Sequence, residues 1–194
     1  TWNHENELAA PQRNPGGVLV PQTEKGLTGK GFEFLAEMER MHMIVDVSHL
    51  SDKGFWDIVE HGTRPFAASH SNCRALAPHT RNLTDEMIRA LSERGGIAGL
   101  NYYAPFLDTD PTHPENCRST VELIAKHAAH YKQVGGAQMI ALGSDFDGID
   151  GPHQLENAAF LPLLADALRK EGFTEDEVEG IYYRNAMRFF EENL

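Results

Sequence analysis

Met43-Ile44-Val45-Asp46-Val47-Ser48-His49 is a short β-branched run that closes on a serine–histidine pair, and this composition indicates a strand. A second run, Pro65-Phe66-Ala67-Ala68, closes on the same pair, Ser69-His70. A third run, Met139 to Leu142, continues into Gly143-Ser144-Asp145. If these strands are parallel neighbours, their ends bring two imidazoles and a carboxylate into one mouth. That is where α/β barrels and open α/β sheets place their chemistry.

Strands and helices alternate along the chain. We expect strands over 43–47, 65–69, 97–101 and 139–142, and helices over 28–42, 52–60, 84–93, 119–134, 155–171 and 175–191. Ser51 and Thr84 are suited to cap two of these helices, and Thr174 with Glu177 forms a capping box for the last one. We expect loops over 1–27 and 104–117, and the second is long enough to act as a lid or a binding loop.

This alternation predicts an α/β fold with right-handed crossovers and a parallel sheet. Four strands are too few for a closed (β/α)8 barrel, which typically takes about 250 residues. An open half-barrel would expose strand edges, which proteins normally protect. We therefore interpret residues 1–194 as a single domain that forms part of a TIM-barrel-type (β/α)8 fold, from about strand 4 or 5 to strand 8. Absent sequence or another chain would supply the N-terminal half.

Composition excludes several classes of protein. With 194 residues, 41% of them hydrophobic, the chain can bury a core, and a net charge of −12 argues against a nucleic-acid partner. No stretch is long and apolar enough to cross a bilayer. Cys73 and Cys117 lie far apart and form no disulfide framework, so we expect a reducing, cytoplasmic location. The chain opens on Thr1 without a signal-peptide pattern, so we expect that its native start was removed or lies upstream.

His49 and His70 are candidate metal ligands. A single histidine after a strand is more often a hydrogen-bonded structural residue, but two at equivalent strand ends favour a shared ligand role. Imidazole and carboxylate together suit zinc. Asp145 occupies the same slot after its strand, where a carboxylate can take a proton from a metal-bound water and pass it to a leaving amine. Ser48 and Ser69 are expected to be turn residues.

Arg81 carries a planar guanidinium that can bind a substrate carboxylate through two hydrogen bonds. The remaining histidines have no evident chemical partner. We expect His79 at the surface, and His127 and His130 on the solvated face of the 119–134 helix. Cys73 lies near His70, but no further residue is arranged to make it a nucleophile.

Several motifs together resemble the renal or membrane dipeptidases, which are zinc-dependent peptidases with an amidohydrolase-like barrel. The matching stretches are Gly26-Leu27-Thr28 to Glu37-Met38, Met43 to His49, Ser69-His70-Ser71-Asn72, Arg81-Asn82-Leu83-Thr84-Asp85, Gly143-Ser144-Asp145-Phe146-Asp147-Gly148 and Asn185-Ala186-Met187-Arg188. They span essentially the whole chain. Each motif alone is weak, but their order and spacing together are specific.

The resemblance implies an active site with two zinc ions joined by a bridging glutamate. The family's two strand-end histidines on the second metal match His49 and His70. Its proton-carrying aspartate matches Asp145, and its arginine for the free carboxylate of the dipeptide matches Arg81. The implied reaction is hydrolysis of a dipeptide by a hydroxide that bridges the two metals.

A further family histidine, in a Leu-Thr-His segment, helps to bind or polarise the substrate. The chain reads Thr1-Trp2-Asn3-His4, so Trp2 is the direct counterpart and His4, two residues late, is the candidate substitute. The family's His-x-Asp pair and its bridging glutamate have no counterpart in the chain. We therefore expect the 194 residues alone to bind metal poorly and to be inactive.

Two alternatives stay open. One is another amidohydrolase-like enzyme, acting on a cyclic amide, a lactam or a lactone. The other is a non-catalytic half-barrel that pairs with itself, which would make it a homo-oligomer. A dipeptide is the expected small-molecule partner. No membrane partner is expected, because residues 189–194 lack the hydrophobic tail of a lipid-anchored protein.

Overall fold

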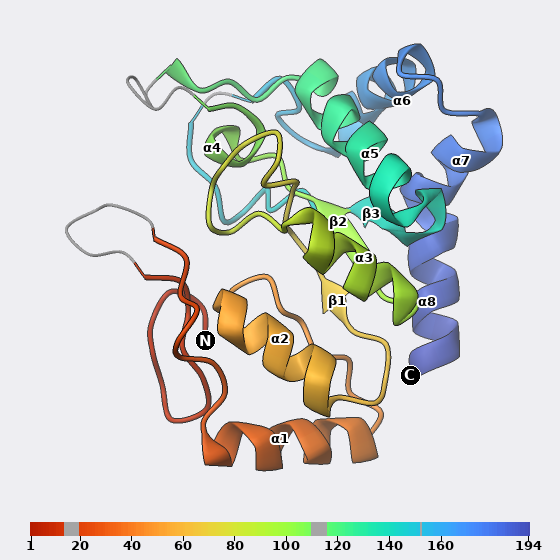
Figure 1. The fold of residues 1–194 in the computed structure, drawn as a ribbon. Helices are drawn as coiled ribbons and strands as arrows, with labels where there is room; N and C mark the ends of the chain where they lie inside the picture. The colour runs from red at the N-terminus through yellow and green to blue at the C-terminus, as the bar shows by residue number, and fades with distance from the viewer. Residues whose placement is uncertain (14–19, 110–115, 152) are drawn as a thin grey trace.

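A small sheet lies at the centre of the molecule, with helices around it (Figure 1). The computed structural model describes residues 1–13, 20–109, 116–151 and 153–194. In chain order the elements are α1 (Gly29–Arg40), α2 (Asp52–His61), β1 (Ala67–Ala68), α3 (Asp85–Glu93), β2 (Ile97–Leu100), α4 (Ala104–Leu107), α5 (Val121–Gly135), the 3₁₀ turn η3 (Ala137–Met139), β3 (Ile140–Leu142), the 3₁₀ turn η4 (Ala158–Phe160), α6 (Leu161–Lys170), α7 (Glu175–Glu179), the π-helical turn η5 (Gly180–Arg184) and α8 (Asn185–Asn193). The predicted α/β class is confirmed.

The strands pair in parallel and in chain order, β1–β2–β3. Ala67 lies opposite Ile97, and Ala98 lies opposite Ile140. A single parallel bridge between Asp46 and Ala67 adds the 43–47 segment on the outer side of β1. All these segments therefore run in one direction and end at one edge of the sheet.

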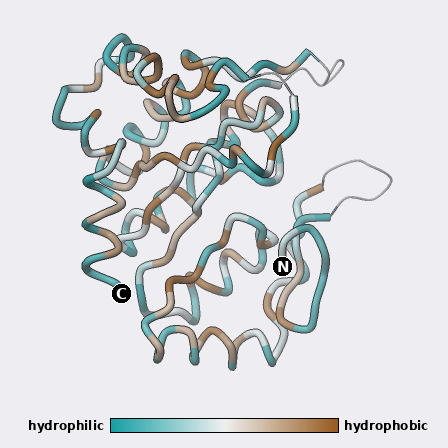
Figure 2. The backbone as a smooth tube through the Cα atoms, turned by 180° about the vertical axis from the view of Figure 1, so that it is seen from behind, coloured by the Kyte–Doolittle hydropathy of each residue, from teal (hydrophilic) through white to brown (hydrophobic). Residues whose placement is uncertain are grey.

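Alternate strand residues face two separate apolar clusters. Ala68 and Ile140 belong to the main core, which also contains the inward faces of α3 and α5. Ala67 and Ile97 point the other way and pack with Phe189 of α8. This period of two is that of a strand with both faces covered. Figure 2 shows hydrophobic stretches running through these central segments.

Two glycines allow the strand ends to come close together. A Cβ atom on either Gly99 or Gly143 would collide with the carbonyl oxygen of Ser69. The N–H of Ser71 donates to the Gly99 carbonyl at 3.0 Å, and the N–H of Gly143 donates to the Leu100 carbonyl at 3.0 Å. Backbone therefore contacts backbone at this edge, which only glycine permits.

Helix starts follow the predicted caps at Ser51, Thr84 and Thr174, and Thr28 is a further cap that was not predicted. Thr28, Ser51 and Thr84 each accept a hydrogen bond from the backbone N–H three residues further on. Thr174 and Glu177 form the predicted capping box at the start of α7. These contacts are local in sequence, so the four helices begin at or one residue after their predicted starts.

The C-terminal third differs from the prediction. The helix predicted over 155–171 begins only at Leu161, after η4, because Pro162 suits the first turn of a helix and not its interior. The helix predicted over 175–191 is interrupted by the wider turn η5, which starts at Gly180. The strand predicted over 43–47 is reduced to the bridge at Asp46, since β1 offers a partner of only two residues.

The two predicted loops also contain some regular structure. The 104–117 segment includes the short helix α4, and its residues 110–115 lie outside the described residues. The 1–27 segment is crossed by antiparallel bridges between Ala9 and Leu27 and between Arg13 and Val20. In the described part of the chain, no helix combines the length and the apolar character needed to cross a membrane.

His127 is buried, and the prediction of a solvated position is wrong. The side chain is 1% exposed. Its Nδ1 accepts the N–H of Cys73 at 3.1 Å, and its Nε2–H donates to the Leu107 carbonyl at 3.1 Å. Burial lowers the pKa of His127 to about 4, so the ring is neutral. It ties the loop after β1 to α4. His130 is not simply solvated either, because its Nε2 lies 2.7 Å from the Asp85 carboxylate.

The buried His127 ring predicts a specific pH dependence of stability. The unfolded chain protonates this histidine near pH 6.5, whereas the folded chain does so only near pH 4, so the free energy of unfolding falls as the pH drops from 6.5. We expect His127→Gln to remove about 1.5 kcal/mol of the decrease between pH 6.5 and about pH 5, measured by urea unfolding. The matched control His61→Gln changes an exposed ring and should keep the wild-type profile. Parallel profiles for His127→Gln and wild type would disprove the assignment.

Candidate active site

Four polar side chains follow the strands at the same edge of the sheet. His49 comes after the bridge at Asp46, His70 after β1, Asn101 after β2 and Asp145 after β3. Because the strands are parallel, these positions meet at the carboxyl edge. The structure therefore gathers the three strand-end residues expected from the sequence and adds a fourth, the asparagine.

His49 and His70 face each other across this edge. Their Nε2 atoms are 2.9 Å apart, and their ring centroids are 4.9 Å apart. The Ser69 hydroxyl donates to the Asp46 carboxylate at 2.6 Å and lies 2.7 Å from Nδ1 of His70. Since the hydroxyl proton is already used, Ser69 Oγ accepts the Nδ1–H of His70. The Nδ1–H of His49 donates to the side-chain oxygen of Asn3 at 3.2 Å.

Each Nε2 atom is therefore left with a lone pair that points toward the other ring. Two facing lone pairs at this distance repel each other unless a cation or a proton lies between them. Burial, followed by the nearby charge of Arg81, lowers the pKa of His70 and brings that of His49 to about 3. Both rings are thus neutral at pH 7. Neutral imidazole nitrogens held in this way fit a zinc ion.

The imidazole pair does not make a complete zinc site by itself. Among the described residues, no third His, Cys, Asp or Glu offers a ligand atom within 4.8 Å of both ring nitrogens. Catalytic zinc sites typically have about three protein ligands. In the described chain, three such residues with ligand atoms within 4.8 Å of one another lie elsewhere, on α2: Asp57, Glu60 and His61. The Asp57 carboxylate is already bonded to Lys53 and to the N–H of Leu27.

Asp145 lies on a turn shortly after β3. Its φ of +64° is left-handed, which is uncommon for a residue with a side chain. The carboxylate oxygen Oδ2 accepts a hydrogen bond from Nδ2 of Asn101 at 3.1 Å. A Cβ atom on Gly148 would collide with the other oxygen, Oδ1, so this glycine leaves room for the carboxylate. The charge of Asp145 is close enough to His70 to oppose the lowering of its pKa.

Arg81 reaches the same edge from the loop after β1. Its Nε–H donates to the Ser48 carbonyl at 2.5 Å, and its guanidinium carbon lies 5.4 Å from the centroid of the Phe106 ring. Among the described residues, its buried Nη2 has no hydrogen-bond partner. Burial lowers the pKa of Arg81 to about 10, so the group stays charged. A half-buried guanidinium whose buried Nη2 has a free donor is suited to bind an anion such as a carboxylate.

His49, Arg81 and Asp145 line one cleft of about 500 Å³. Its lining includes His49, His79, Arg81, Tyr103, Phe106 and Asp145. The cleft therefore combines imidazole, guanidinium and carboxylate with an aromatic wall. Such a combination is typical of sites that bind small polar molecules.

Two histidines lie in unexpected places. His79, predicted at the surface, is half-buried and lines the cleft, because its Nδ1 accepts the N–H of Arg81 at 3.2 Å and its ring packs 4.4 Å from that of Phe106. Burial lowers the pKa of His79 to about 4. His4, expected to contact substrate, is exposed, and its ring packs 5.6 Å from that of Trp2. In the described part of the chain, Trp2 lines the cleft and His4 does not.

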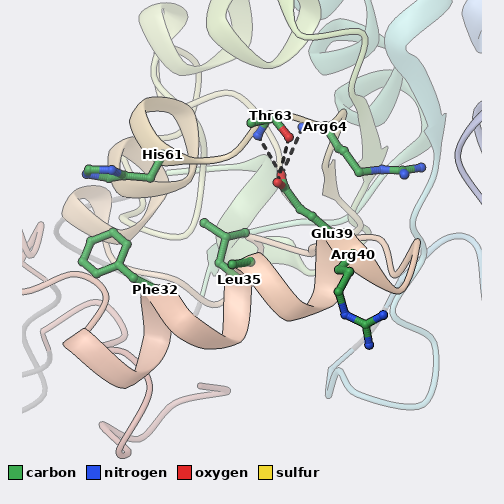
Figure 3. A pocket seen from close by; sticks show the side chains of 8 residues that line it. Phe32, Leu35, Glu39, Arg40, His61, Thr63 and Arg64 are labelled. Atoms are coloured by element: carbon green, nitrogen blue, oxygen red, sulfur yellow. Dashed lines mark hydrogen bonds between the residues drawn. The ribbon is translucent and has the colours of Figure 1, made fainter.

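A second hollow, of about 680 Å³, lies between α1 and the end of α2 (Figure 3). Glu39 points across it and accepts the backbone N–H groups of Thr63 and Arg64 at 2.8 and 3.0 Å. The Thr63 hydroxyl donates to the same carboxylate at 2.8 Å. Figure 3 also shows Phe32 beside His61 at the other end of the hollow. The Glu39 carboxylate is engaged in holding α1 to the chain after α2. We therefore interpret this hollow as a structural feature.

Two residues that complete the cleft edge were not predicted. Asn101 occupies the same strand-end slot as the predicted residues, and that position is the signal that could have identified it. Asp46 is the carboxylate inside the β-branched run, and it accepts hydrogen bonds from the N–H groups of Ser48 and Ser69 at 3.1 and 3.0 Å. Asp46 is exposed in this structure, so these hydrogen bonds, and not burial, fix the position of its carboxylate.

One family model matches nearly the whole chain. Residues 1–193 match the model described as membrane dipeptidase, peptidase family M19. The chain belongs to this family. The resemblance that the motifs indicated is therefore confirmed.

Relatives of this M19 chain cover almost all of it. The chain is 36% identical over 189 residues to a Klebsiella pneumoniae protein, described as an uncharacterised protein in the pqqA 5′ region, with 96% of this chain and 68% of that protein covered. It is 33% identical over 190 residues to an uncharacterised dipeptidase of Schizosaccharomyces pombe, with 97% of this chain and 44% of that protein covered.

A solved metallopeptidase from Rhodobacter sphaeroides, liganded with a phosphinate mimic of the dipeptide L-Ala-D-Ala, shares the fold of this M19 chain. The TM-score is 0.88 at 31% identity, with 100% of this chain and 54% of the Rhodobacter chain covered. A solved M19 dipeptidase gives a TM-score of 0.86 at 32% identity, with 99% of this chain and 54% of that chain covered. The chain thus spans about half the length of these solved relatives.

The contacts of Ser69 predict that it supports metal binding. Without the Ser69 hydroxyl, the Nδ1–H of His70 loses its acceptor. The His70 ring can then rotate, and its Nε2 lone pair no longer points toward the position between the two imidazoles. We expect Ser69→Ala to weaken Zn²⁺ affinity about 10-fold to 100-fold, measured by competition with a chromogenic chelator. Ser92→Ala is the matched control, because its hydroxyl donates to the Gly135 carbonyl away from the imidazoles. Equal affinities for Ser69→Ala and wild type would rule out the supporting role.

Proposed function

We propose that the intact enzyme is a zinc-dependent dipeptidase that hydrolyses the peptide bond of dipeptides. The observation that carries this proposal is that His49, whose Nε2 lies 2.9 Å from that of His70, lines the same cleft as Arg81 and Asp145. Membership of the M19 family supports it. So does the Rhodobacter sphaeroides relative, whose solved structure holds a mimic of a dipeptide.

His49 and His70 would hold one zinc ion through their Nε2 atoms. Bound zinc would polarise the scissile carbonyl and lower the pKa of water toward neutrality. A second zinc with a bridging glutamate needs ligands that the described residues do not bring together. We infer that these ligands come from elsewhere in the intact enzyme, so the 194 residues alone bind zinc weakly and turn over no dipeptide. Binding of two zinc ions by the isolated chain would contradict this inference.

The parallel sheet is consistent with one arc of a (β/α)8 barrel. Its strands alternate with helices and carry their polar residues at the carboxyl edge, as barrel enzymes do. We propose that further strands complete such a barrel in the intact enzyme. The coverage of 54% of the Rhodobacter chain supports this proposal.

Arg81 is proposed to bind the free carboxylate of the dipeptide. Its Nη2 lacks a hydrogen-bond partner among the described residues, so a bound carboxylate would offset part of the cost of burying the charge. The Phe106 ring lies against the guanidinium and limits where it can move. Binding a terminal carboxylate at this point restricts the enzyme to very short peptides.

Asp145 is proposed to move the proton. Because Oδ2 is held by Asn101, Oδ1 is the oxygen that takes a proton from the attacking water and delivers it to the nitrogen of the scissile bond. The C–N bond breaks after the new C–O bond has formed, and the amine leaves as a neutral group. The carboxylate is then ready for another cycle.

The role of Asp145 predicts a loss of turnover without a loss of metal. We expect Asp145→Asn in the intact enzyme to lower kcat by about 10²-fold to 10⁴-fold while the zinc content stays unchanged, measured by dipeptide hydrolysis and atomic absorption. Asp147→Asn is the matched control, since Asp147 is exposed and does not line the cleft. Near-normal turnover by zinc-loaded Asp145→Asn would reject the proton-carrying role.

The role of Arg81 predicts a dependence on the substrate's charge. We expect Arg81→Met to lower kcat/KM for a dipeptide about 10-fold to 100-fold, because a charge-assisted hydrogen bond is lost. For the matching dipeptide amide, which has no carboxylate, the variant and wild type should be equally slow. Arg89→Met, at an exposed position on α3, is the control. If a lactam is hydrolysed faster than every dipeptide in the same panel, the enzyme is a cyclic amidase instead.

A further inference from the structure

Three completely buried asparagines form a chain of hydrogen bonds behind the cleft. Asn72, Asn82 and Asn101 are each 0% exposed. The side-chain oxygen of Asn82 accepts the N–H of Asn72 at 3.1 Å. Asn72 in turn pairs with both backbone groups of Asn101: its Oδ1 accepts the N–H at 3.0 Å, and its Nδ2 donates to the carbonyl at 2.9 Å. The Asn72 side chain therefore extends the sheet pairing beyond the end of β2.

The side-chain amide of Asn101 uses both of its ends. Its Oδ1 accepts the N–H of Tyr103 at 2.6 Å, and its Nδ2 donates to Oδ2 of Asp145 at 3.1 Å. A flipped amide would set its NH₂ group against the N–H of Tyr103 and its oxygen against a carboxylate. Both contacts would be repulsive, so the hydrogen-bond partners determine the orientation. The donor of Asn101 points at Asp145.

Asp145 depends on this donor for its orientation. Its backbone is in the left-handed region, at a φ of +64°, which aspartate adopts more readily than most residues with a side chain but which does not by itself orient the carboxylate. Within the described residues, Asn101 is the only side chain that hydrogen-bonds to the Asp145 carboxylate. Gly148 leaves room beside Oδ1 but offers no side-chain donor there. One hydrogen bond therefore selects which oxygen is held and which is free.

We propose that Asn101 is the positioning residue for Asp145, and that Asn72 holds Asn101 in place through its backbone. This inference rests on the proposed function, because it deepens the part played by Asp145. Burial matters here, since an amide held in the interior by the neighbouring asparagine cannot be replaced by water without cost. The chain of asparagines transmits the register of the sheet to the orientation of one carboxylate.

The test is a double-mutant cycle in the intact, zinc-loaded enzyme. We expect Asn101→Ala to lower kcat for a dipeptide about 10-fold to 100-fold, while KM changes by less than about threefold. In the Asp145→Asn background, Asn101→Ala should lower kcat by less than about threefold, because its effect passes through the lost carboxylate. Asn185→Ala is the matched control. Its amide donates to the carbonyls of Ala137 and Ile140, at the opposite end of β3, and its loss should leave kcat unchanged in both backgrounds.

Each other outcome is informative. Losses that multiply in the double variant, an unchanged kcat in Asn101→Ala, or a change in KM alone would each overturn the positioning role. If Asn101→Ala does not fold, Asn101→Ser is the second variant, because a serine hydroxyl can still accept the N–H two residues further on, at Tyr103, while its shorter side chain does not replace the donor to Asp145. A normal kcat for that variant would also overturn the role. A wild-type enzyme without dipeptidase activity, or an active Asp145→Asn, would instead refute the proposed function.

Discussion

Parallel pairing of short strands is the constraint on which the cleft depends. β1, β2 and β3 all end at the same edge of the sheet. The parallel pairing alone therefore places the residues that follow the strands side by side, whatever the conformation of the loops. A slip of one residue in the pairing of β1 would turn each of its side chains to the other face of the sheet. His70 would then no longer meet His49, and the 2.9 Å approach of their Nε2 atoms would be lost.

The chemistry of the cleft comes from the polar groups that the fold leaves unsatisfied. Behind the edge, the side chains of the buried asparagines are matched with partners, since each unmatched buried group would cost about 1–3 kcal/mol. The exposed Asp46 and Ser69 side chains are hydrogen-bonded to each other. Within the described residues, the buried Thr80 Oγ1 and the Tyr102 hydroxyl also have no partner, and further unmatched groups lie at the edge itself. The two imidazole Nε2 atoms face each other, and Nη2 of Arg81 has no partner among the described residues. A metal ion and an anion are the partners that such groups require.

The sequence was sufficient for features that depend on near neighbours. The caps at Ser51 and Thr84 involve residues three positions away, and the strand-end slots of His49 and His70 follow from the strand pattern. It was insufficient where the partner is distant. His127 is buried because it contacts Cys73, 54 residues earlier, and Leu107, 20 residues earlier. Periodicity on a helix does not contain that information.

The same limit explains the asparagine at the end of β2. An asparagine after a strand looks like a turn residue, and its role becomes visible only when Asn72 and Asp145 are seen on either side of it. The interruption of the last helix at η5 is a similar case. No proline interrupts this segment, and Gly180 is the local feature of the sequence that marks where the helix changes.

The crowding of backbone around the Ser69 carbonyl limits how this chain can be re-engineered. Gly99 and Gly143 have no room for even a methyl group, although neither carries a functional side chain. Libraries that vary these positions will yield misfolded proteins rather than altered substrate preference. Substitutions that aim to change what the cleft binds are better made at Tyr103 or Ile149. Their side chains line the cleft and lie outside the closely packed strand ends.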